Sequence, residues 1–73
     1  TPQKGIILNA SNEVAVSAFL QGQIHFGKIS ELVLKLMEDF VDFDFTSLTD
    51  IESISALDSK VRVKSQEWIN KNT

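Results

Sequence analysis

The chain has 73 residues and a formal net charge of −3, with 42% of its residues hydrophobic and 23% charged. This balance is typical of an ordered globular domain and excludes a disordered tail. Because the chain contains no cysteine, thiol catalysis, cysteine-based zinc sites and disulfide scaffolds are also excluded.

Size and charge also limit the partners of the chain. For a chain this short, the free energy gained by burying apolar surface roughly equals the free-energy cost of the conformational entropy lost on folding. The domain is therefore marginally stable alone, and we expect it to dock onto a larger body. The acidic balance argues against nucleic acid as a partner, and the loose group of Lys60, Arg62 and Lys64 predicts a solvated helix surface.

No apolar run approaches the roughly 20 residues that span a bilayer, which argues against a membrane partner. Since the chain begins with Thr1 rather than methionine, we expect it to be a piece of a longer protein.

The first predicted helix covers roughly residues 2–21. Thr1 and Pro2 form a helix start, because threonine can cap free N–H groups and proline is tolerated at the first helical position. Gly22 is predicted to end the helix. The apolar residues that recur at helical spacing are Ile7, Leu8, Ala10, Val14, Ala15, Ala18 and Phe19.

A short connector at residues 24–27 leads to a second predicted helix with the most regular apolar pattern in the chain. Glu31 and Lys35, four residues apart, are predicted to form an ion pair on its outer side. Leu34 lies off the apolar stripe and is expected to contact something outside this chain. The stripe consists of Ile29, Leu32, Val33, Leu36, Met37 and Phe40.

Residues 41–46 alternate apolar and acidic side chains, which could indicate a strand. A single strand without a partner would leave its backbone hydrogen bonds unmade, so we predict an extended loop instead. Val41, Phe43 and Phe45 are expected to cover the open end of the core.

Two helix-capping patterns follow this loop. Ser47 with Asp50 predicts a short third helix, and Ser55 with Asp58 predicts a fourth helix in which Asp58 pairs with Arg62. The predicted fold class is therefore all-α, a small compact bundle of four helices packed mostly antiparallel, with residues 1–73 as one domain. The third helix would carry Leu48, Ile51 and Ile54, and the fourth Leu57, Val61, Trp68 and Ile69.

Few residues are candidates for catalysis or metal binding. His25 is the only histidine, and no carboxylate stands at a spacing that would make it a base, so it is interpreted as exposed. Asp39, Asp42 and Asp44 lack the spacing of a calcium loop and favour a solvated acidic loop. Ser59 superficially resembles the modified serine of acyl carrier proteins, which in that family begins the second helix. We predict no catalytic, cofactor-binding or metal-binding residue in this chain.

Two segments of the chain resemble a known family. Residues 7–29, ILNASNEVAVSAFLQGQIHFGKI, resemble the C-terminal helical domain of 1-deoxy-D-xylulose 5-phosphate reductoisomerase, where Leu-Asn-Ala-Ala-Asn-Glu, Ala-Phe-Leu and Ile-x-Phe-x-x-Ile occur in this order. Residues 47–62 are similar to its Ser-Leu-x-Asp-Val/Ile helix and x-Asp-x-x-x-Arg turn. Ser11 replaces the second alanine, and Lys28 stands where the family usually has aspartate. The matching residues are Leu8, Asn9, Ala10, Asn12, Glu13, Ala18, Phe19, Leu20, Ile24, Phe26, Ile29, Ser47, Leu48, Asp50, Ile51, Asp58 and Arg62.

The resemblance implies a larger parent enzyme of non-mevalonate isoprenoid biosynthesis. That enzyme converts 1-deoxy-D-xylulose 5-phosphate to 2-C-methyl-D-erythritol 4-phosphate with NADPH and a divalent metal, Mg or Mn. It is expected to be a homodimer in the bacterial cytoplasm or a plastid-type organelle, with separate dinucleotide-binding and catalytic domains. Because the cofactor and metal residues belong to those domains, the fragment alone is predicted to be inactive.

Asn9, Asn12 and Glu13 are predicted to form an inter-domain contact. Their spacing places them on one side of the first helix, where amides and a carboxylate can hydrogen-bond a neighbouring backbone. We hypothesise that this side holds the parent's catalytic domain and keeps its substrate-covering loop in place. The alternative is that these residues only join the first helix to the other helices of this domain. Two other function classes stay open, a free-standing acidic helical adaptor and a carrier protein modified at Ser59.

Overall fold

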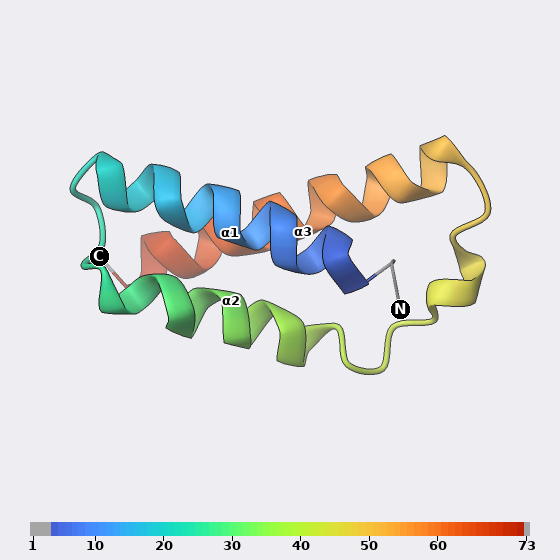
Figure 1. The fold of residues 1–73 in the computed structure, drawn as a ribbon, viewed down its shortest axis with the longest axis horizontal. Coiled ribbons are helices and arrows are strands. Elements are labelled where there is room, and N and C mark those ends of the chain that lie inside the picture. The colour runs from blue at the N-terminus through green and yellow to red at the C-terminus, as the bar shows by residue number, and fades with distance from the viewer. Residues whose placement is uncertain (1–3, 73) are drawn as a thin grey trace.

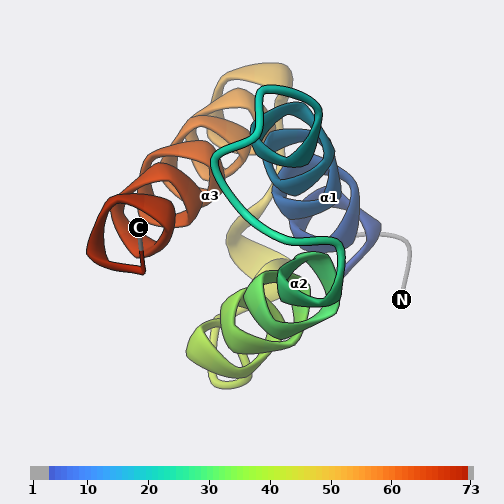
Figure 2. The ribbon, with the colours of Figure 1, turned by 90° about the vertical axis from the view of Figure 1, so that its left-hand side faces the viewer.

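The computed structural model describes residues 4–72 as three α-helices and one short 3-10 turn. The helices are α1 (Lys4–Leu20), α2 (Gly27–Asp39) and α3 (Ile51–Lys71), and the 3-10 turn η1 is Phe45–Ser47. Successive helices run in opposite directions, so α1 and α3 point the same way (Figure 1). Viewed from one end, the three helices lie at the corners of a triangle (Figure 2). Residues 4–72 contain no strand, and none of their helices is long and apolar enough to cross a membrane.

The prediction of four helices is wrong, because the expected third and fourth helices form η1 and one continuous helix, α3. Asp50 is the N-cap of α3: its carboxylate accepts from the backbone N–H of Ser53 at 2.8 Å, and the Ser53 hydroxyl accepts from the backbone N–H of Asp50 at 3.3 Å. No glycine or proline interrupts residues 51–71, so Ser55 and Asp58 lie inside the helix instead of starting one. The all-α class and the antiparallel packing of consecutive helices are confirmed.

The helix α1 ends at Leu20, and Gly22 terminates it, as predicted. Gly22 has a φ of +76°, a left-handed conformation that glycine adopts without a Cβ penalty. Its backbone N–H donates to the carbonyl of Phe19 at 3.0 Å, and that of Gln23 donates to the carbonyl of Ala18 at 2.9 Å. These two bonds form a Schellman motif, which satisfies the last carbonyls of the helix. The predicted start at Thr1 and Pro2 lies outside the described residues.

Ion pairs along α2 differ from the prediction. The ammonium of Lys28 lies 2.9 Å from the Glu31 carboxylate, and that of Lys35 lies 3.1 Å from Asp39. The predicted pair between Glu31 and Lys35 is therefore wrong, because Glu31 pairs with Lys28 and Lys35 pairs with Asp39. The N-cap of α2 is Phe26, whose side chain cannot accept a hydrogen bond, so this helix starts without a side-chain cap.

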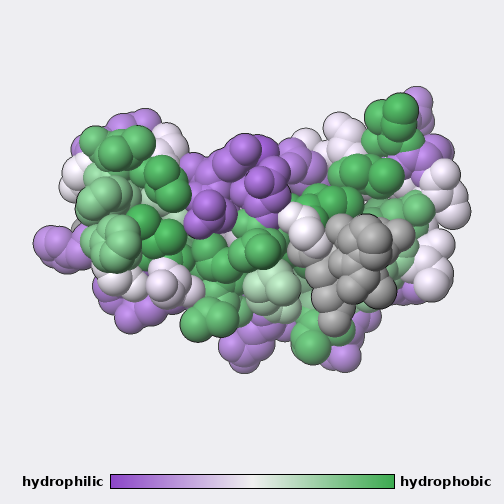
Figure 3. All heavy atoms as spheres, in the orientation of Figure 1, coloured by the Kyte–Doolittle hydropathy of each residue, from purple (hydrophilic) through white to green (hydrophobic). Residues whose placement is uncertain are grey.

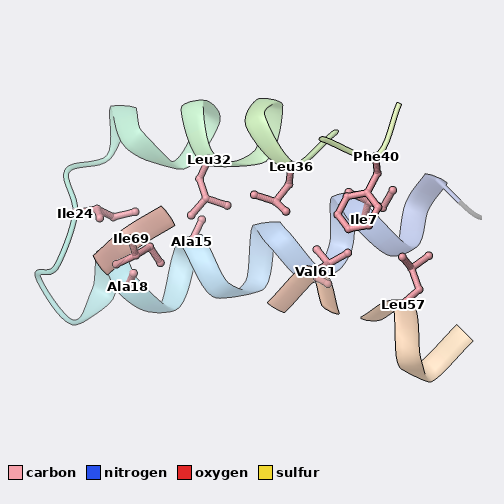
Figure 4. Packing of buried hydrophobic residues seen from close by; sticks show 11 residues of the cluster. Ile7, Ala15, Ala18, Ile24, Leu32, Leu36, Phe40, Leu57, Val61 and Ile69 are labelled. Atoms are coloured by element: carbon pink, nitrogen blue, oxygen red, sulfur yellow. The ribbon is translucent and has the colours of Figure 1, made fainter. Parts of the chain in front are cut away.

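The core lies between the three helices and combines small residues of α1 with larger ones of α2 and α3 (Figure 4). Two serines are fully buried in this packing. The Ser11 hydroxyl donates to the carbonyl of Ile7 at 2.6 Å, and that of Ser65 to Val61 at 2.8 Å, so neither is left unsatisfied. The buried apolar residues are Ile7, Ala10, Ala15, Ala18, Ile24, Leu32, Leu36, Phe40, Leu57, Val61 and Ile69.

The loop between α2 and α3 partly covers the end of the core. Phe43 and Phe45 are half-buried against the core, with their rings packed edge to face at 5.1 Å, which confirms the prediction for these two residues. Val41 was expected beside them but is 72% exposed. Ile51 and Ile54, two apolar residues of the expected third helix, are 83% and 39% exposed. Apolar surface therefore remains open at the start of α3.

Candidate interaction surface

The exposed side of α1 carries amides, one carboxylate and large apolar side chains. Asn9, Asn12 and Glu13 are all exposed there. Leu8, Val16 and Leu20 lie among them, and Leu20 is one of the most exposed apolar residues of the domain. Apolar surface gathers at the end of α1 that adjoins the α1–α2 connector, with hydrophilic surface above the middle of the helix (Figure 3). We call this set of residues the α1 face: Leu8, Asn9, Asn12, Glu13, Val16 and Leu20.

Two shallow grooves extend the α1 face. The first, of about 510 Å³, follows α1 and is lined by Asn12, Glu13, Val16, Ser17, Leu20 and Gln21. The second, of about 460 Å³, lies between the first half of α1 and the start of α3, where Asn9 shares the groove with Ile51 and Ile54. Ile51 and Ile54 therefore continue the apolar surface of α1 onto α3.

Charge is unevenly distributed among the helices. The sequence of α1 contains two charged residues among 17, Lys4 and Glu13, whereas α2 contains five among 13 and α3 seven among 21. An exposed helix side with apolar residues and few charges is typical of protein surface that a partner covers. Of the three helices, α1 matches that description best.

Arg62 of α3 joins two sequence motifs that lie far apart in the chain. Its Nε donates to the Oδ2 of Asp58 at 2.8 Å, and its Nη2 donates to the Oε2 of Glu13 at 2.6 Å. These bonds to Asp58 and then to Glu13 raise the pKa of Arg62, because both carboxylates favour the charged guanidinium. The predicted pair between Asp58 and Arg62 is confirmed. The contact with Glu13, 49 residues away, links α1 to α3 at the edge of the α1 face.

The three predicted contact residues differ in their local bonding. Glu13 joins α1 to α3 through Arg62, as the within-domain alternative requires. The side chains of Asn9 and Asn12 make no hydrogen bond to another residue within 5–72, and both line the grooves. Glu13 therefore has a partner on α3, whereas the amides of Asn9 and Asn12 have no hydrogen-bond partner among residues 5–72.

Comparison with known proteins assigns the chain to a family. The family model described as "DXP reductoisomerase C-terminal domain" matches residues 1–64. The chain belongs to the DXP reductoisomerase C-terminal domain family. The match covers both segments whose resemblance to this family was noted in the sequence.

Bacterial relatives support the DXP reductoisomerase assignment. The 1-deoxy-D-xylulose 5-phosphate reductoisomerase of Lawsonia intracellularis is 49% identical over 65 residues, which cover 88% of this chain and 15% of that enzyme. The enzyme of the same name from Wolinella succinogenes is 46% identical over 61 residues, or 84% of this chain and 16% of the relative. The chain thus spans about a sixth of the length of the curated relatives it matches. No solved structure is significantly similar to it.

The other candidate residues of this DXP reductoisomerase domain do not assemble into a chemical site. Asp39 pairs with a lysine, Asp44 caps η1 by accepting from the backbone N–H two residues later, and His25 is exposed in the connector. Ser59 lies in the interior of α3, unlike the carrier serine, which begins a helix. Within the described part of the chain, no group of three or more His, Cys, Asp or Glu residues is arranged to hold a metal ion. These residues therefore do not fit the divalent metal that the family implies.

The last two turns of α3 lie after the segment that matches the DXP reductoisomerase family. They still belong to the core, because Ser65 and Ile69 are buried and Trp68 packs against the cluster. Ile69 lies next to Ala18 and Ile24 in Figure 4. The fold of this domain therefore includes residues beyond the family match.

Proposed function

We propose that this domain is the C-terminal part of a 1-deoxy-D-xylulose 5-phosphate reductoisomerase and supports its catalytic domain by docking. The observation that carries the proposal is the α1 face, where exposed Val16 and Leu20 lie among amides with a single carboxylate. A free-standing domain gains nothing from exposing these side chains to water, whereas a docked one buries them. The relatives are about six times longer than the matched segment, which leaves ample protein to cover this face.

The parent enzyme, in this proposal, converts 1-deoxy-D-xylulose 5-phosphate to 2-C-methyl-D-erythritol 4-phosphate with NADPH and a divalent metal, Mg or Mn. Both cofactors would be bound by the dinucleotide-binding and catalytic domains, because residues 4–72 do not fit a metal site. The bacterial relatives are consistent with a cytoplasmic enzyme. The expected homodimer would form through the rest of the parent, and the isolated domain would be inactive.

The α1 face suits the backbone of a neighbouring domain. Asn9 and Asn12 each offer an amide that can donate and accept, and neither is used within residues 5–72. The apolar side chains of Val16 and Leu20 would supply the area buried on docking. Docking would thereby hold the parent's substrate-covering loop in place, which is how a domain without catalytic groups would affect turnover.

A chimeric enzyme tests this proposal. The segment of the Lawsonia intracellularis reductoisomerase that matches this chain is replaced by the chain itself, and NADPH oxidation is followed with substrate and Mg²⁺. Val16→Glu would place a charge in the docking surface and lower kcat/KM by about tenfold or more. Val63→Glu is the matched control, because Val63 is 60% exposed on α3 and lines neither groove of the α1 face.

Two results would contradict the proposal. One is equal activity of the Val16→Glu and Val63→Glu chimeras, since the α1 face would then be free in the enzyme. The other is NADPH oxidation above the blank by the isolated 73-residue chain, because catalysis would then not depend on the missing domains.

A further inference from the structure

Glu13, Arg62 and Asp58 form a charged cluster with more carboxylates than cations. One guanidinium serves both carboxylates, with contacts of 2.6 Å to Glu13 and 2.8 Å to Asp58. The cluster therefore carries a net charge of −1. The three side chains are between 37% and 54% exposed, so water solvates this surplus charge in the isolated domain.

The cluster connects the two grooves of the α1 face, because Arg62 contacts one residue from each of them. Glu13 lines the groove along α1, and Asp58 lines the groove shared by Asn9, Ile51 and Ile54. Any protein that covers both grooves must also cover the cluster and remove water from it. A net charge buried without compensation destabilises an interface, whereas a charge matched by the partner steers and orients docking.

The lysines of α2 and α3 lie away from this cluster. Lys35, Lys64 and Lys71 line a groove between α2 and α3, and Lys60 lines a groove beside η1. Lys28 pairs with Glu31 on α2. Among the described basic side chains, only Arg62 forms an ion pair with either carboxylate of the cluster. The described side chains therefore leave one negative charge of the cluster for a partner to match.

We propose that the surface docked on the α1 face presents a lysine or arginine to the Glu13–Arg62–Asp58 cluster. This inference rests on the proposed docking to the remainder of the reductoisomerase. It adds the chemistry of the partner's surface, which is apolar with one basic side chain facing the cluster between the two grooves. The cation binds the carboxylate oxygens that Arg62 leaves free, and Arg62 positions Glu13 for this contact. The apolar rim formed by Val16, Leu20, Ile51 and Ile54 excludes water around it.

The test measures binding of the 73-residue chain to the Lawsonia intracellularis reductoisomerase that lacks its matching segment. Isothermal titration calorimetry gives the Kd from about 0.05 M to about 0.5 M sodium chloride. The variant Glu13→Gln with Asp58→Asn keeps side-chain shape and changes the cluster charge from −1 to +1. The control, Glu38→Gln with Glu67→Gln, makes the same change in net charge on exposed carboxylates that line neither groove. Circular dichroism checks that each chain is folded.

The proposal predicts that the cluster variant binds about tenfold more weakly, and that the control variant binds within about twofold of the unsubstituted chain. It also predicts that the Kd of the unsubstituted chain rises with salt, a measurement that needs no substitution. Equal affinity of the two variants, or a salt-independent Kd, would overturn the basic partner residue while leaving docking itself intact. No binding by the unsubstituted chain at any salt concentration would instead contradict the proposed docking, and this inference with it.

Discussion

Leu36 tests whether the stability of this domain resides in the core between its helices. The side chain is 1% exposed and projects from α2 into the core. Truncation to alanine removes three carbon atoms, which at about 0.8 kcal/mol each weakens folding by about 2.4 kcal/mol. A residual void of about 40 Å³ adds about 1 kcal/mol. The expected loss for Leu36→Ala is therefore about 3 kcal/mol.

That loss is large for a domain of this size, whose total stability is expected to lie between about 4 and about 11 kcal/mol. The melting temperature should fall by about 12–24 °C. Leu34→Ala is the matched control, since Leu34 lies on the same helix but is 68% exposed, and its free energy of unfolding should change by less than about 0.5 kcal/mol. Urea unfolding followed by far-ultraviolet circular dichroism measures both variants. A loss below about 1 kcal/mol for Leu36→Ala, or equal losses for the two, would refute this account of the core.

Two further predictions concern the ends of the helices. Gly22→Ala should destabilise the domain by about 1–2 kcal/mol, because an alanine is strained at the φ of +76°. Gly27→Ala should be neutral or stabilise the domain by up to about 1 kcal/mol, since the space around Gly27 is open. Equal urea midpoints for the two variants would contradict this prediction. The hydrogen bonds from the Ser53 backbone and hydroxyl lower the pKa of the Asp50 carboxyl in the folded state. The carboxylate therefore contributes its full stabilisation above the ordinary pKa of 3.8, and this stabilisation is lost as the pH falls through the lowered folded-state value. Asp50→Ala should lower the melting temperature by a few degrees at neutral pH, with a difference that shrinks in acid; a difference that is constant with pH would show that the cap is not the cause.

The sequence was informative wherever the determinants of structure are local. The apolar stripe of α2 and the glycine that ends α1 depend on residues within a few positions of each other, and both were predicted correctly. The Ser55 and Asp58 capping pattern was misleading, because the same residue types are tolerated inside a helix. Asp50 with Ser53 caps α3 five residues earlier than that pattern, and nothing in the sequence then stops the helix.

The candidate surface was predicted only in part. The spacing of Asn9, Asn12 and Glu13 identified the exposed side of α1, but the contact of Glu13 with Arg62 depends on α1 and α3 packing in parallel. The parallel direction of α1 and α3 follows from there being three consecutive helices that alternate in direction, whereas the sequence pattern predicted four. The exposure of Ile51 and Ile54 was missed for a similar reason, since apolar residues at helical spacing indicate a buried side without showing whether this chain buries it.

If the remainder of a reductoisomerase covers the α1 face, a thiol placed on that face should lose access to solvent when the two bind. The chain contains no cysteine, so Val16→Cys and Val63→Cys each introduce a single thiol, one on the α1 face and one on α3 outside it. Each variant is labelled with a maleimide, alone and with the Lawsonia intracellularis enzyme that lacks its matching segment. Docking through the α1 face should make the enzyme slow labelling at position 16 by about tenfold and leave position 63 unchanged. Equal labelling rates at position 16 with and without the enzyme would contradict it.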